Sequence, residues 1–187
     1  GETEQAAELS GSQLAAVERS RQQMERFGSV LVEPRETRAG YDQALLRGLS
    51  AGWRGDEPGT AAFLGAVETQ ARQSLEAVRV GVPAKLTLSG KTGHFPVSIE
   101  NGLPQAVRVG LHFTSANPDR LTVPDVPAQV IEPGETAQVL VEANAVTNGS
   151  VDVSVRPVTA DGVAISAPTP FVVKATNYDT IGWIVVG

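Results

Sequence analysis

Apolar residues alternate with polar ones on both sides of a short turn between His94 and Phe113. A period of two is typical of β-strands that bury one face and expose the other. The alternating positions are Phe95, Val97, Ile99, Val107, Val109, Leu111 and Phe113. Further segments with the same period lie before and after this pair, and turn residues separate them. The sequence therefore predicts an immunoglobulin-like antiparallel β-sandwich of about a hundred residues.

Turn residues and prolines set the expected limits of the other strands. The remaining segments that alternate are 84–89, 121–123, 136–145, 151–155 and 163–173. Asn148-Gly149 and Asp161-Gly162 are strong signals for hairpin turns. Proline cannot donate a ladder hydrogen bond, so three prolines confine the stretch that they punctuate to an edge strand or a loop. These are Pro124, Pro127 and Pro133.

Before Val80 the apolar residues follow a helical spacing of three to four. This spacing predicts three helices, over residues 2–27, 37–53 and 56–78. The first helix is expected to end at Gly28, and Asp56 is the predicted N-cap of the third. Each helix has one narrow apolar stripe, so we expect the three to pack on one another as a short bundle.

The predicted organisation is therefore α+β and multidomain. It consists of a three-helix bundle at 1–79, the sandwich at 80–176 and a tail at 177–187. No Gly/Ser-rich linker separates the third helix from the first strand around 77–83, so the helices and the sandwich are expected to behave as one rigid unit.

Composition excludes several kinds of function. The chain has 15 Lys and Arg against 21 Asp and Glu, a formal net charge of −6, which argues against a nucleic-acid partner. It contains no cysteine, so disulfides, thiolate metal sites and thiol nucleophiles are excluded.

An apolar stretch, Ile181 to Gly187, follows the sandwich. It is too short to cross a bilayer, which needs about 20 residues. Tyr178 and Trp183 are aromatic residues of the kind found at membrane interfaces. We therefore interpret Tyr178, Ile181, Trp183 and Ile184 as membrane-proximal, at the start of a truncated transmembrane helix. The alternative is that the stretch forms a last β-strand.

Candidate metal ligands have simpler explanations in this sequence. His94 and His112 would face each other if their strands formed a simple hairpin, but in an immunoglobulin-like arrangement the two strands belong to different sheets. Either way a third ligand is missing, so no metal site is predicted. Asn117, Asp119 and Asp125 could suggest a calcium loop, but their spacing matches no EF-hand and turn formation explains them.

Neither a catalytic group nor a cofactor site is predicted. No serine or threonine has a nucleophile-elbow context or an evident histidine partner. Tyr41 and Trp53 could stack on sugar rings, although aromatic residues at helical spacing more often belong to a core. Asn148-Gly149-Ser150 fits a glycosylation acceptor formally, but the predicted turn already explains it.

Three stretches carry a resemblance to a known family: Leu49 to Arg54, Phe95 to Leu103, and Thr176 to Trp183. With them the chain resembles the C-terminal part of an uncharacterised family of actinobacterial membrane-anchored cell-envelope proteins, typically encoded beside the lipid II flippase of peptidoglycan synthesis. The resemblance implies an extracytoplasmic domain that follows a longer N-terminal region and ends in a single transmembrane helix. It implies no catalytic residues.

Taken together, these features predict a non-enzymatic extracytoplasmic scaffold or interaction module, connected with peptidoglycan or cell-wall assembly. The expected partner is an envelope or membrane protein or a cell-wall glycan. Two other functions fit the same sequence: a glycan-binding module, or an accessory domain of an enzyme whose active site lies in an N-terminal region outside this sequence.

Overall fold

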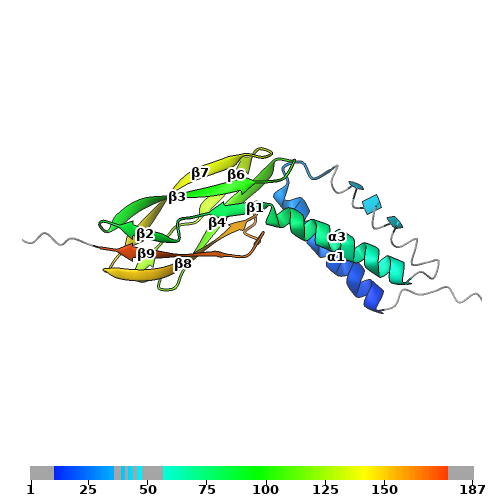
Figure 1. Ribbon diagram of the computed structural model, residues 1–187, viewed down its shortest axis with the longest axis horizontal. Helices are drawn as coiled ribbons and strands as arrows, with labels where there is room; N and C mark the ends of the chain where they lie inside the picture. Colours follow the sequence, from blue (N-terminus) through cyan, green and yellow to red (C-terminus); the bar gives the residue numbers. More distant parts are fainter. Residues whose placement is uncertain (1–10, 36–38, 41, 44–45, 48–56, 177–187) are drawn as a thin grey trace, which may run out of the picture.

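The computed structural model describes residues 11–35, 39–40, 42–43, 46–47 and 57–176 of the 187-residue chain. Within these ranges the chain forms two long helices and nine β-strands. The strands make up a sandwich, and the helices lie side by side at one end of it (Figure 1). The end of the last strand lies at the opposite end of the sandwich from the helices.

The first sheet of the sandwich has four strands in the order β1-β3-β7-β5, and all its pairs are antiparallel. Its strands are β1 (Val78–Gly81), β3 (Thr92–Asn101), β7 (Thr136–Ala145) and β5 (Leu121–Thr122). Strand β1 follows directly on the second long helix and forms one edge of this sheet.

The second sheet has five strands in the order β2-β9-β8-β4-β6. Its strands are β2 (Lys85–Leu88), β9 (Thr169–Ala175), β8 (Gly149–Val158), β4 (Val107–Ser115) and β6 (Val126–Ile131). Strand β2 runs parallel to β9, whereas the other pairs are antiparallel. The chain therefore changes sheets between β1 and β2.

The core lies between the two sheets and contains the alternating residues that the sequence singled out. All seven of them, from Phe95 to Phe113, are buried. Phe95, Phe113 and Phe171 form an aromatic cluster with ring centroids 5.7 to 6.4 Å apart. Burial of one such side chain contributes about 1.5 to 3 kcal/mol. The predicted immunoglobulin-like sandwich is thus confirmed, but it is not wholly antiparallel, because β2 pairs with β9 in parallel.

One predicted hairpin is wrong. Asn148-Gly149 does form a turn, with Gly149 at φ +122, but it joins β7 to β8, which belong to different sheets. An Asn-Gly pair favours a tight reversal of the chain, while the burial of each strand's apolar face decides which strand becomes its neighbour. Asp161-Gly162 reverses the chain after β8, where Gly162 N donates to the Thr159 carbonyl at 3.0 Å.

The predicted three-helix bundle is also wrong. The described residues contain two long helices, α1 (Gly11–Val30) and α3 (Glu57–Glu76), which pack against each other. Gly28 lies inside α1 and does not end it. Most of the second predicted helix, 37–53, and the predicted N-cap Asp56 lie outside the described residues.

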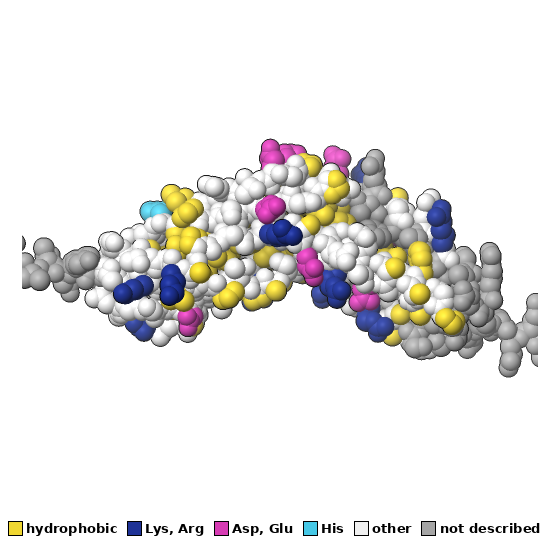
Figure 2. Space-filling model, viewed as in Figure 1, with side chains coloured by type: hydrophobic (Ala, Val, Ile, Leu, Met, Phe, Trp, Pro, Cys, Tyr) yellow, Lys and Arg dark blue, Asp and Glu magenta, His cyan; other side chains and the backbone are white. Residues whose placement is uncertain are grey.

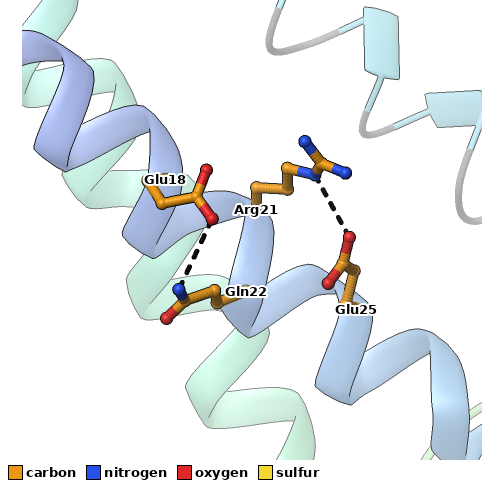
Figure 3. A network of polar contacts seen from close by, with 4 residues as sticks. All are labelled: Glu18, Arg21, Gln22 and Glu25. Atoms are coloured by element: carbon orange, nitrogen blue, oxygen red, sulfur yellow. Dashed lines mark hydrogen bonds and ion pairs between the residues drawn. The ribbon is translucent and has the colours of Figure 1, made fainter.

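The apolar stripes of the two helices are covered without a bundle because the sandwich covers part of them. Phe27, Val30, Leu31 and Leu75 belong to the same buried cluster as the sandwich core. The opposite face of α1 is polar: Arg21 pairs with Glu25 at 3.1 Å, and Gln22 donates to Glu18 at 3.4 Å (Figure 3). One partner helix and the end of the sandwich are therefore enough to bury the narrow apolar stripe of each helix.

Two connections attach the helices to the sandwich. After α1, Leu31 forms an isolated antiparallel bridge with Val107, and Val32 N donates to the Ala106 carbonyl at 3.1 Å. After α3, Ala77 alone separates the helix from β1. Backbone pairing and a shared core thus position the helices where the two sheets end.

Candidate functional site

The two histidines lie on different sheets and each has an acidic neighbour. On β3, His94 Nε2 lies 3.3 Å from Glu142 Oε2, and on β4, His112 Nδ1 lies 2.8 Å from Asp125 Oδ2. The described part of the chain brings no three His, Asp or Glu side chains together in a way that could hold a metal ion. The hairpin arrangement that would have paired the histidines is therefore not formed.

Asp125 fixes the loop that follows β5. Its Oδ1 accepts a hydrogen bond from Phe113 N at 2.9 Å. Burial tends to raise the pKa of the Asp125 carboxyl, but the hydrogen bonds from His112 and Phe113, with the charge of His112, hold that pKa below its usual value. Asn117 closes a turn, since its carbonyl accepts from Arg120 N and Leu121 N. Turn and strand contacts explain both residues without calcium.

A buried asparagine holds together the sandwich end that faces the helices. Asn101 Nδ2 lies 2.8 Å from the Gln105 carbonyl and 3.0 Å from those of Ile131 and Glu132, and its Oδ1 accepts from Leu103 N at 3.0 Å. Asn101 is the last residue of β3, beside the short turn between the two alternating segments. Its position at the end of an alternating strand gave no sign that it would be fully buried.

A cleft of about 610 Å³ lies between the helices and the sandwich. We call it the elbow cleft. Its lining comes from α1, α3, β1, the segment before β9 and the start of β9: Gln23, Arg72, Leu75, Glu76, Val78, Arg79, Val80, Ile165, Ser166, Ala167 and Thr169. Its volume falls in the range of about 300 to 1,000 Å³ that is usual for binding pockets. The sequence did not predict this cleft, because its walls are up to 146 residues apart in the chain (Gln23 to Thr169).

The elbow cleft exposes one edge of the first sheet. Gly102 N donates to the Ala77 carbonyl at 3.0 Å, so Ala77 directs its backbone groups toward β3. Along a strand these groups alternate in direction, so Arg79 also faces β3 whereas Val80 faces away from it. Val80 is only half-buried, and its backbone N–H and C=O have no hydrogen-bond partner among the residues that the structure describes.

The charged residues of the elbow cleft are two arginines and one glutamate. Arg72 lies 4.0 Å from Glu76 on the exposed surface of α3. Arg79 is exposed on β1 and makes no ion pair in the described ranges. On the face shown in Figure 2, basic and acidic side chains gather where the sandwich meets the helices. The cleft thus combines an apolar floor with an excess of positive charge.

The other sites considered from the sequence fall outside the described residues. These are Tyr41, Trp53, Tyr178, Ile181, Trp183 and Ile184. Neither helix in the described ranges is long and apolar enough to cross a membrane.

The fold and the elbow cleft define a class of protein: an immunoglobulin-like sandwich with a pair of packed helices at one end and a cleft between the helices and the sandwich. The chain belongs to a family of unknown function, DUF6049, whose sequence pattern matches residues 1–178. No match was found among curated proteins.

Three similar solved structures each cover about half of the chain. WR4, a C. elegans MSP family member, is 10% identical, with a TM-score of 0.38, over 54% of this chain and 98% of WR4. Native E. coli alpha-2-macroglobulin is 15% identical, with a TM-score of 0.40, over 54% of this chain and only 6% of that protein. A PapD-like domain of human CEP192 is 11% identical, with a TM-score of 0.36, over 54% and 86%.

Proposed function

We propose that this chain is a non-catalytic interaction module of a membrane-anchored cell-envelope protein. The observation that carries the proposal is the elbow cleft, in which an apolar floor, free arginine charge and an unpaired strand edge meet. Such an arrangement suits recognition of another protein, because apolar contacts supply affinity while backbone and charged groups supply specificity. The fold alone would not indicate this function.

The last strand, β9, ends at the opposite end of the sandwich from the elbow cleft, which supports an outward orientation for the cleft (Figure 1). After β9, Thr176 N and Oγ1 both donate to the Leu88 carbonyl, at 2.9 and 3.1 Å, at the sandwich end far from the helices (Figure 1). We propose that the apolar residues 181–187 begin a membrane helix and that the sandwich lies on the extracytoplasmic side of the membrane. The sandwich would then stand on the membrane by this end, and the elbow cleft would point away from the lipid.

The resemblance described above supports a role in peptidoglycan or cell-wall assembly. Under this proposal the partner is another protein of the envelope. A cell-wall glycan is the competing partner, and nuclear magnetic resonance titration of the chain with peptidoglycan fragments would reveal it through saturable shifts.

Site-specific photo-crosslinking in cells tests the interaction function. A photoreactive amino acid would replace Glu76 in the elbow cleft or, as the matched control, Glu68, which is also an exposed residue of α3 but lies outside the cleft. Both substitutions keep Arg79. We expect a discrete protein adduct from position 76 and none from position 68. Equal labelling from both positions, or no adduct from position 76, would contradict the proposed function.

A further inference from the structure

We propose that the elbow cleft binds an extended peptide segment that adds as a strand to the free edge of β1 and places an acidic side chain against Arg79. This inference rests on the proposed interaction function and names the kind of partner. A short extended segment of a protein, and not a folded surface, would be the ligand.

The backbone of β1 supplies the first reason. Val80 directs its N–H and C=O away from β3, and neither group has a partner among the described residues. An added strand satisfies both groups with its own backbone, which is the basis of recognition by strand addition. Val78 has the same orientation but is only 1% exposed, so Val80 is the accessible pairing position.

The side chains around Val80 give the second reason. Leu75 and Ile165 are buried at the floor of the elbow cleft, and Arg79 is exposed beside them. In an added strand successive side chains point to opposite faces. One set would therefore meet apolar residues and the other would meet the guanidinium group of Arg79. The matching ligand alternates apolar and acidic residues.

The dimensions limit the ligand to a short segment. Strand β1 has four residues, about 13 Å at roughly 3.3 Å per residue. The cleft volume of about 610 Å³ suits a ligand of this size. We expect weak binding, because few hydrogen bonds form and each contributes about 0.5 to 1.5 kcal/mol net.

The other free edges in the described part of the sandwich are less suitable. Strand β5 has two residues, β2 carries Lys85, and β6 carries Pro127. Shortness, lysine and proline are the usual means by which proteins block pairing at an edge. Strand β1 contains neither lysine nor proline.

A five-residue peptide that alternates valine and glutamate, with both ends blocked, is the probe. It would be added to the full 187-residue chain up to about 1 mM, with affinity followed by nuclear magnetic resonance. We expect saturable shifts at β1 and slower hydrogen exchange of the Val80 amide. A peptide with lysine in place of glutamate should bind at least about fivefold more weakly, because it meets Arg79 with like charge.

Two proline variants distinguish strand addition at β1 from non-specific peptide binding. Val80→Pro removes an N–H that is unpaired in the free protein, so the fold should survive while peptide affinity falls about tenfold. Val130→Pro is the matched control at the free edge of β6, where alternation also directs the N–H outward. It should leave affinity unchanged, and thermal unfolding would verify that both variants fold.

Arg79→Glu provides an independent variant at the same site. We expect it to reverse the preference between the glutamate and lysine peptides. Equal affinity of the glutamate peptide for the unsubstituted chain and for Val80→Pro would overturn strand addition. So would an exchange rate of the Val80 amide that the peptide leaves unchanged. If those results came together with adducts from position 76, the interaction function would stand and the partner would be a folded protein.

Discussion

The side-chain amide of Asn101 donates to the backbone carbonyl of Ile131 at 3.0 Å inside the protein, 30 residues further along the chain. Asn101 is 0% exposed and holds the β3–β4 loop to the end of β6. The bonds from Asn101 to the Ile131 carbonyl and from Leu103 N to Asn101 are both buried, so water cannot replace the Asn101 side chain there.

Substitution of Asn101 should therefore be costly. Asn101→Ala removes the buried hydrogen bonds to Leu103 N and to the Ile131 carbonyl, and Asn101→Asp presents a carboxylate to carbonyl oxygens, so we expect each to lower the free energy of unfolding by about 3 kcal/mol. Urea denaturation measures the change. Asn144→Ala is the control, since the hydrogen bond between Thr92 and Asn144 is exposed, and it should cost less than about 1 kcal/mol. A loss under 1 kcal/mol at Asn101 would contradict this account.

Asp125 should make stability depend on pH in the acid range. Its pKa is lowered in the folded state, so its contribution is complete above the unfolded pKa, near pH 4, and is lost as the pH falls through the folded value. The group is more than half exposed, so the effect should stay below about 1 kcal/mol. Unfolding free energies of the chain and of Asp125→Asn, measured from pH 7 to pH 3, should converge as the pH falls. Asp152→Asn serves as an exposed control. A constant difference across this range would count against the interpretation.

The two helices and the sandwich should unfold together. Leu75 on α3 is 4% exposed and belongs to the cluster that also contains the sandwich core. Leu75→Ala should therefore lower the free energy of unfolding by about 2 to 5 kcal/mol. Circular dichroism and nuclear magnetic resonance signals of the sandwich should show one and the same shifted transition. Leu14→Ala, at a 54% exposed position of α1, should change stability by less than about 0.5 kcal/mol. Rapid proteolysis between residues 78 and 84 that releases a stable sandwich would show instead that the two parts are independent.

The sequence predicted the strands better than their partners. Alternation assigned Phe95, Val97 and Ile99 to the inner face because one face of a half-buried strand must be apolar. Alternation does not say which strand lies next to which, so the Asn148-Gly149 turn was assigned to a hairpin although it crosses between sheets. Local patterns carry no direct information on pairing between distant segments.

The elbow cleft was beyond sequence reasoning for a similar reason. Its walls come from the junction of α3 and β1, from the segment around Ile165, and from helices that pack against the end of the sandwich. The unpaired state of Val80 is likewise a property of sheet order, because a strand of the same sequence in the middle of a sheet would have both edges satisfied.

The last prediction concerns the residues from Ile181 onward, which lie outside the described ranges. If they begin a membrane helix, Thr176 to Thr180 is the whole spacer between sandwich and bilayer, at most about 17 Å at roughly 3.4 Å per residue. In the full-length protein, deletion of everything from Ile181 onward should release the protein from the membrane fraction of cells. Replacement of the deleted part by an unrelated apolar helix of about 20 residues should restore membrane binding, because length and apolarity suffice for insertion. If the deleted protein stays membrane-bound, its anchor lies elsewhere, and the outward orientation of the elbow cleft loses its support.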